Sequence, residues 1–160
     1  MKVYLAADHA GLRMKAALLE HVHMMGHDVE DLGAFSFDPE DDYPDVVTPL
    51  AERVAGETGS RGIICAGSGQ GEGMCANRVP GARAAVLYAL VPASEALDKE
   101  GARSEDGYDV VRLARKHNDA NILSIGSRFI SMEEATEAVR VFIETPFSGD
   151  ERHARRIAKF

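Results

Sequence analysis

A buried strand followed by a tight loop is predicted by the run Gly62-Ile-Ile-Cys-Ala-Gly67-Ser-Gly69-Gln-Gly71-Glu72-Gly73. Ile63–Ala66 is short, apolar and β-branched at its start, which is typical of a buried strand. The glycines that follow allow the backbone to turn tightly and to bring several N–H groups close to a ligand. We expect a helix to begin near Met74, with its positive end facing the same spot, so that the loop suits an oxyanion or a phosphate.

Glu72 is the one carboxylate inside this group of donors. It would repel a phosphate, so the loop is predicted to be more than a phosphate cradle. We interpret Glu72 as a base placed beside oxyanion donors. A dinucleotide-binding fingerprint would need glycine at position 72 and would follow the first strand, and a P-loop would need Gly-Lys-Ser/Thr. The run has neither pattern.

The rest of the chain alternates strand-like and helix-like segments around this run. Strands are expected within residues 3–7, 28–32, 63–66, 83–88 and 121–130, and helices over about 12–25, 44–55 and 132–144. This alternation predicts parallel βαβ units, and therefore a three-layer α/β/α sandwich with a five-stranded parallel, Rossmann-like sheet. We expect one domain over 1–160, with Leu90–Asp109 as an inserted surface segment that holds a short helix near Pro92–Lys99.

Composition narrows the class of partner. The formal net charge of −8 over 160 residues argues against nucleic acid or an anionic membrane surface. No apolar run approaches the length of a membrane span, and Met1 leads directly into a strand-like segment, which leaves no room for a targeting peptide. Cys65 and Cys75 are expected to be buried thiols rather than a disulfide, so the sequence indicates a reducing cytoplasm.

Outside the loop, each candidate group also has a plain structural interpretation. Asp8-His9 follows a strand, where such a pair often caps a turn or helix. Tyr43 beside Pro44 is typical of packing, and His117-Asn118 could simply end a helix. The basic tail Arg152–Arg156 places Arg152 and Arg156 on one helical face, where they could clamp a phosphate or only favour the helix dipole.

Taken in order, these motifs carry a family resemblance. They are Asp8-His9-Ala10-Gly11, Tyr43-Pro44-Asp45, the loop 67–72 leading to Ala76-Asn77-Arg78 and Pro80-Gly81-Ala82-Arg83, His117–Asn121, Gly126-Ser127-Arg128 and Arg152–Arg156. The chain resembles the ribose-5-phosphate isomerase B family, which also contains galactose-6-phosphate isomerase subunits, nearly from end to end. Members interconvert phosphorylated aldoses and ketoses without a metal or other cofactor, and work as dimers with sites at the subunit interface.

The resemblance implies a role for each candidate residue. It gives the ring-opening proton transfer to His117, with Asp8 assisting, and a sugar hydroxyl to Asn118. Glu72 would remove the C2 proton and return it at C1, while loop N–H groups and Ser68 stabilise the enediolate. The implied substrate-binding residues are His9, Tyr43, Gly67, Gly69, Gly71, Asn118, Arg128, Arg152 and Arg156, with the last two reaching in from a partner subunit. A homodimer or a tetramer is therefore expected.

Two departures from the family pattern matter. Many members carry a catalytic cysteine directly before the glycine loop, where this chain has Ala66. Cys65 lies one residue earlier, so its side chain should point to the other face of the strand. The chain instead resembles the branch that uses a glutamate, Glu72, as the base. The second departure is Leu90–Asp109, which typical members largely lack.

Several alternatives stay open from the residues alone. A metal-dependent isomerase would need a cluster of His, Asp or Glu at ligand spacing, and none is convincing. A sugar-phosphate or nucleotide-binding module without catalysis could use the same loop, but it would gain nothing from Glu72. Among isomerases, ribose 5-phosphate is favoured over allose or galactose 6-phosphate and over erythrulose 4-phosphate.

Overall fold

The computed structural model describes residues 1–160 and contains one sheet of five parallel strands in the order β2-β1-β3-β5-β4. The strands are β1 (Lys2–Ala7), β2 (Asp28–Asp31), β3 (Arg61–Ala66), β4 (Ala84–Leu87) and β5 (Ile122–Gly126). The helices are α1 (Leu12–Met24), α2 (Pro44–Gly56), α3 (Gln70–Ala76), α4 (Asp109–Asn118), α5 (Met132–Glu144) and α6 (Glu151–Ile157). The predicted α/β class and parallel sheet are confirmed.

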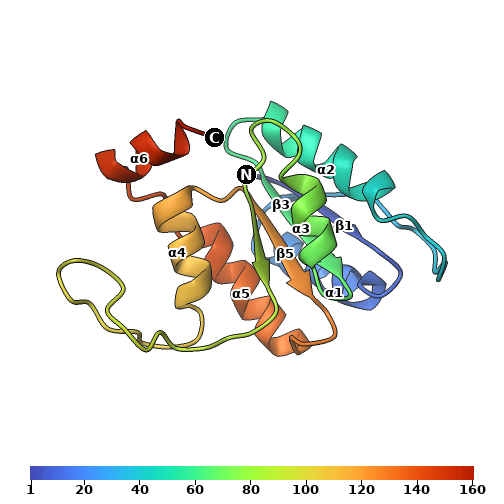
Figure 1. Ribbon diagram of the computed structural model, residues 1–160. Coiled ribbons are helices and arrows are strands. Elements are labelled where there is room, and N and C mark those ends of the chain that lie inside the picture. The colour runs from blue at the N-terminus through green and yellow to red at the C-terminus, as the bar shows by residue number, and fades with distance from the viewer.

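Helices cover both faces of the sheet, so the sandwich has three layers (Figure 1). Alternate residues of β1 and β3 point to opposite faces: Leu5 and Cys65 belong to the cluster packed under α1 and α5, whereas Ala6 and Ala66 belong to the cluster packed under α2. Side chains on both faces are fully buried, as expected for a parallel sheet.

Local signals in the sequence fix the element ends. Gly26 adopts φ +83° just after α1, a conformation that glycine reaches without steric cost. Pro44 begins α2. Ser131 and Glu134 form a reciprocal capping box at α5, which begins and ends where the sequence predicts.

The segment between β4 and α4 contains no helix, so the predicted short helix near Pro92–Lys99 is wrong. It leaves the carboxyl end of β4, passes below the sheet and loops out beside α4 (Figure 1). Short-range bonds hold it, including Leu97 N–H to the Ala102 carbonyl at 2.8 Å and Ser104 Oγ to Asp109 at 2.7 Å. Gly101, at φ +87°, and the surrounding polar residues favour this irregular turn over a helix.

Candidate active site

The glycine loop connects β3 to α3 at the carboxyl edge of the sheet. α3 begins at Gln70, earlier than predicted, so Glu72 lies in the first turn of this helix. Gly69 has φ +75°, and its carbonyl accepts a 2.7 Å hydrogen bond from the Ser124 hydroxyl of β5. The backbone N–H groups of Ser68, Gly69 and Gly71 donate to no group in the chain. They are therefore available to an anion.

Asp8 ties the loop to the end of β1. Its buried carboxylate accepts hydrogen bonds from Gly11 N–H at 2.9 Å and from Gly67 N–H at 3.3 Å. A side-chain carbon at Gly11 would lie 1.9 Å from the Cys65 carbonyl oxygen, so only glycine allows this approach. Asp8 and Gly11 of the Asp8-His9-Ala10-Gly11 motif therefore also have a structural role, which is to hold the end of β1 against the glycine loop.

His9 is held by Asp41, a residue that the sequence analysis did not single out. Asp41 accepts from His9 N–H at 2.7 Å, and its other oxygen lies 2.7 Å from His9 Nδ1. This side-chain bond raises the pKa of His9 above its usual 6.5. The sequence did contain a signal for this contact: the acidic loop 38–42 follows β2, so it lies at the same sheet edge as Asp8-His9.

Glu72 is buried, with 5% of its surface exposed. Burial raises the pKa of its carboxyl, and the negative charges of Asp8 and Asp41 raise this pKa further. A hydrogen bond from the backbone N–H of Glu72 itself acts in the opposite direction. A carboxylate whose pKa is raised in this way is a stronger base than an exposed one.

Tyr43, Arg128 and Ser68 surround the loop. A side-chain carbon at Gly71 would lie 2.8 Å from the Tyr43 hydroxyl oxygen, and one at Gly67 would lie 3.1 Å from Arg128 Cζ. Ser68 is half-buried beside them. The structure therefore brings nine predicted site residues to one edge, namely Asp8, His9, Tyr43, Gly67, Ser68, Gly69, Gly71, Glu72 and Arg128.

The two cysteines lie outside this group. Cys65 is fully buried in the core cluster under α1, and burial raises the pKa of its thiol far above the usual range. Its side chain points away from Ala66, as predicted. Cys75 is only half-buried, which corrects the expectation that both thiols are buried, and neither forms a disulfide.

His117, Asn118, Arg152 and Arg156 lie at the opposite edge. α4 ends at Asn118, just before β5 begins, whereas the glycine loop follows the end of the neighbouring parallel strand β3. Five residues of β5, at roughly 3.3 Å each, separate the two edges by about 16 Å. Figure 1 shows α6 beside the carboxyl-terminal end of α4, near the end of the sheet where the N-terminus lies. One chain therefore does not bring these four residues to Glu72.

The four residues form a second group. The rings of His117 and His153 stack with centroids 4.2 Å apart, and Arg152 Nε donates to His153 Nε2 at 3.2 Å. Arg156 is exposed on the same helix. Burial lowers the pKa of His117, and His153, Arg152 and Lys116 lower it further, so the imidazole is neutral at physiological pH.

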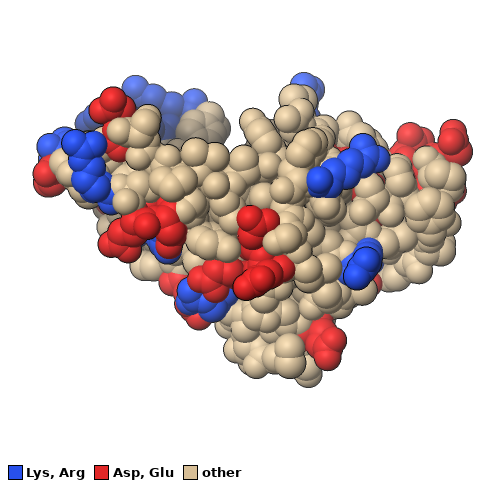
Figure 2. Space-filling model, turned by 90° about the horizontal axis from the view of Figure 1, so that it is seen from below, with Lys and Arg blue, Asp and Glu red and all other residues tan.

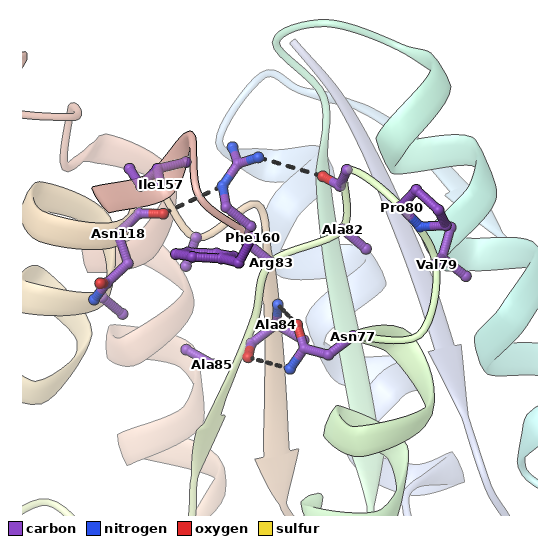
Figure 3. Close-up of a pocket in the computed structure, with 13 residues that line it drawn as sticks. Asn77, Val79, Pro80, Ala82, Arg83, Ala84, Ala85, Asn118, Ile157 and Phe160 are labelled. Atoms are coloured by element: carbon purple, nitrogen blue, oxygen red, sulfur yellow. Dashed lines mark hydrogen bonds between the residues drawn. The ribbon is translucent and has the colours of Figure 1, made fainter. Parts of the chain in front are cut away.

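A pocket of about 470 Å³ lies next to Asn118, between the start of β4 and the C-terminal residues (Figure 3). Arg83 crosses it and donates to the carbonyls of Asn118 at 3.2 Å and Gly81 at 3.3 Å, while Phe160 and Ile157 form one wall. Its remaining lining is mostly alanine, and Arg83 is its one titratable side chain. The pocket lies at the edge of the sheet where the strands begin, opposite the glycine loop. It contains none of the residues grouped around Glu72.

Charged side chains of both signs lie on the carboxyl edge. Figure 2 looks onto this edge from below and shows acidic groups near the middle and at both sides, with basic groups among them and beside them. The chain has no helix long and apolar enough to cross a membrane, and no group of three or more His, Cys, Asp or Glu side chains placed to hold a metal ion.

Comparisons with known proteins identify the family of the chain. A family model described as Ribose/Galactose Isomerase matches residues 3–104 and 102–160. Ribose-5-phosphate isomerase B of Mycobacterium leprae is 40% identical over 157 residues, covering 98% of this chain and 86% of the relative. A putative sugar phosphate isomerase of Bacillus subtilis is 32% identical over 159 residues, covering 99% and 94%.

Solved structures show the same likeness in three dimensions. Ribose-5-phosphate isomerase B of Mycoplasma genitalium, with bound ribulose-5-phosphate, superposes with a TM-score of 0.84 at 34% identity, covering 99% of this chain and 92% of that one. The Thermotoga maritima enzyme gives 0.82 at 35% identity, covering 99% and 95%. The chain therefore belongs to the ribose/galactose isomerase family and is a sugar-phosphate isomerase that interconverts an aldose and a ketose.

Proposed function

We propose that this isomerase converts ribose 5-phosphate to ribulose 5-phosphate through an enediolate, with Glu72 as the base. The observation that carries the proposal is the burial of Glu72 in the first turn of α3, directly after a loop in which the N–H groups of Ser68, Gly69 and Gly71 have no partner. A buried base beside free oxyanion donors is the arrangement that proton abstraction next to a carbonyl requires. The ribulose-5-phosphate held by the Mycoplasma genitalium relative supports this choice of sugar.

In the proposed reaction, Glu72 takes the proton from C2 of the open-chain aldose. The C2–H electron pair forms a C1–C2 double bond, and the carbonyl oxygen at C1 takes the charge. A proton then passes from the C2 hydroxyl to the C1 oxygen, and Glu72 returns its proton to C1. N–H groups of Ser68, Gly69 and Gly71, with the Ser68 hydroxyl, stabilise the charged oxygen, at a few kcal/mol for each donor, typically about 3.

A second copy of the chain would complete the site. The phosphate needs cations, and around Glu72 this chain offers His9 and Arg128 beside the carboxylates of Asp8 and Asp41. We propose that Arg152 and Arg156 of a partner subunit reach over this edge to the phosphate, and that His117 and Asn118 arrive with them. His117 would move the ring-opening proton, Asn118 would hold a sugar hydroxyl, and the homodimer would contain two such sites.

Asp8 is proposed to assist ring opening while it anchors the loop. Two of its acceptor positions are occupied by Gly11 and Gly67 N–H, which leaves other lone pairs for a sugar hydroxyl. Tyr43 would contact the bound sugar from across the loop. We propose that the reaction takes place in the cytoplasm, in keeping with two free cysteines.

The proposed chemistry uses no metal, because loop N–H groups take the enediolate charge. Activity should therefore survive prolonged dialysis against a strong chelator. Loss of activity that one particular divalent ion restores would contradict this part of the proposal.

The substrate is tested with a panel of phosphates. Purified protein is assayed with ribose, allose and galactose phosphates and with erythrulose 4-phosphate, alongside Glu72→Gln. We expect the highest kcat/KM for ribose 5-phosphate and almost none in the variant. A higher kcat/KM for a six-carbon phosphate would reassign the substrate, and binding without turnover of any of them would contradict catalysis.

A further inference from the structure

His153 is the one buried side chain of α6. A short helix with a single anchoring residue is normally held by an apolar side chain, because a buried polar ring must find partners. Here the ring is 4% exposed and lies face to face with His117, with centroids 4.2 Å apart and planes inclined by 11°. The contact between α4 and α6 is therefore centred on two stacked imidazoles.

The hydrogen bond from Arg152 fixes the orientation of the His153 ring. A guanidinium group donates and cannot accept, so His153 Nε2 is the acceptor, at 3.2 Å. Arg152 is itself oriented, because its backbone N–H donates to Asp150 at 2.9 Å and its Nε lies 3.6 Å from the other Asp150 oxygen. The His153 ring is thus held in one orientation, flat against His117.

We propose that His153 is a positioning residue, which sets the plane of the His117 ring and keeps it uncharged for ring opening. This inference rests on the proposed function, in which His117 moves the ring-opening proton. A neutral His117 can take the proton of the anomeric hydroxyl at its free nitrogen. The bond from C1 to the ring oxygen then breaks, a carbonyl forms at C1, and the resulting imidazolium returns the proton to the ring oxygen.

Other charged groups also face His117. On α4 it neighbours Lys116, and beside α6 it faces Arg152 and Asp150. A small cavity of about 110 Å³ next to it is lined by the charged residues Asp109, Arg112 and Lys116 of α4 and by Asp98 of the segment after β4. Burial is the largest influence that lowers the pKa of His117. Removing the His153 ring would admit water to His117, so the pKa of His117 should rise.

Ring opening can be separated from enolisation by the choice of substrate. Ribose 5-phosphate rests mainly as a closed ring, whereas ribulose 5-phosphate has no free hydroxyl with which to close one. Exchange of its C1 hydrogen with solvent deuterium, followed by NMR, therefore measures Glu72 chemistry alone. Conversion of ribose 5-phosphate measures ring opening as well.

The test compares His153→Ala and His153→Phe with wild type, and uses His23→Ala as a matched control on an exposed histidine of α1. In His153→Ala, kcat/KM for ribose 5-phosphate should fall by about 10- to 100-fold, as for a misplaced catalytic group, while C1 exchange persists. His153→Phe restores a flat neutral ring and should recover most of the loss. When kcat/KM for ribose 5-phosphate is plotted against pH, its acid limb should move to higher pH in His153→Ala. The limb should stay in place in His153→Phe.

Three results would overturn the inference: normal ribose 5-phosphate turnover in His153→Ala, equal losses in both folded variants, or an unmoved acid limb in His153→Ala. If His153→Ala does not fold, the Phe variant decides, since a folded Phe variant that exchanges C1 hydrogen but cannot use ribose 5-phosphate contradicts the proposal. A wild-type protein that neither isomerises nor exchanges would instead contradict the proposed function.

Discussion

His9 and Asp41 are joined twice, once through the His9 backbone N–H and once through Nδ1, both at 2.7 Å. They come from segments more than thirty residues apart, and the pair links the end of β1 to the acidic loop after β2. The bond orients the ring and raises its pKa, so His9 carries a positive charge over a wider pH range than a free histidine.

Asp41→Asn should weaken substrate binding at alkaline pH. The raised pKa means that protonated His9 is favoured in the folded protein. The stabilisation of the folded protein by the bond between protonated His9 and Asp41 is fully present below the usual pKa of 6.5. It is lost as the pH rises through the raised pKa. Without Asp41, His9 loses its proton at a lower pH and no longer offers a positive charge to the phosphate. KM should therefore rise more steeply above about pH 6.5 in the variant.

Asp42→Asn is the matched control, because Asp42 is exposed and its side chain forms no hydrogen bond. A direct check is the NMR titration of the His9 ring in each protein. The same His9 pKa in Asp41→Asn and wild type would show that the double bond does not control its charge.

Arg152→Ala and Arg156→Ala should each raise KM for the sugar phosphate by about 10- to 100-fold, the usual loss for a hydrogen bond to a charged group. Residual binding should also respond less to salt, since one ion pair is missing. Arg53→Ala, an exposed arginine near the end of α2, serves as the control. Unchanged affinity for substrate and for inorganic phosphate in both tail variants would leave the tail with a structural role only.

Replacing residues 93–103 with a short Gly/Ser connection should change which sugars are accepted. Leu97, Asp98 and Ala102 line the small cavity beside His117, so the segment borders the group that would serve the partner's site. The replacement keeps the ion pair of Arg112 with Asp106, which anchors the end of the segment to α4. Removing the cavity wall should raise kcat/KM for six-carbon phosphates relative to ribose 5-phosphate. An unchanged ratio in a folded, dimeric variant would show that the segment is a passive surface loop.

The sequence predicted most of the fold, because its signals are local and agree with one another. The β-branched Ile63 and Ile64 of β3 with the glycines after the strand, and the Ser131–Glu134 box at α5, each specify one conformation. The start of α3 was predicted too late, because Gly71 and Gly73 have low helix propensity, and tertiary contacts of the loop override it. The segment after β4 was given a helix that its polar, glycine-containing sequence does not sustain.

The site was predictable in part. Residues that follow β1 and β3 had to meet at one edge, and they do. His117 and Asn118 precede β5, so the parallel topology already implied the opposite edge for them. Asp41 and His153 were missed because their roles depend on long-range contacts, which neither spacing nor residue type reveals.

The central claim is that Glu72 is the base, and the most direct test is turnover of ribose 5-phosphate by Glu72→Gln beside Cys65→Ser. Glutamine keeps the shape and hydrogen-bonding capacity of Glu72 but not its basicity. We expect kcat to fall by about 10²- to 10⁴-fold with little change in KM, whereas Cys65→Ser stays active. In wild type, kcat/KM should fall on the acid side through a pKa above 4.5, since burial raises that of Glu72. An active Glu72→Gln together with a folded but inactive Cys65→Ser would contradict the account.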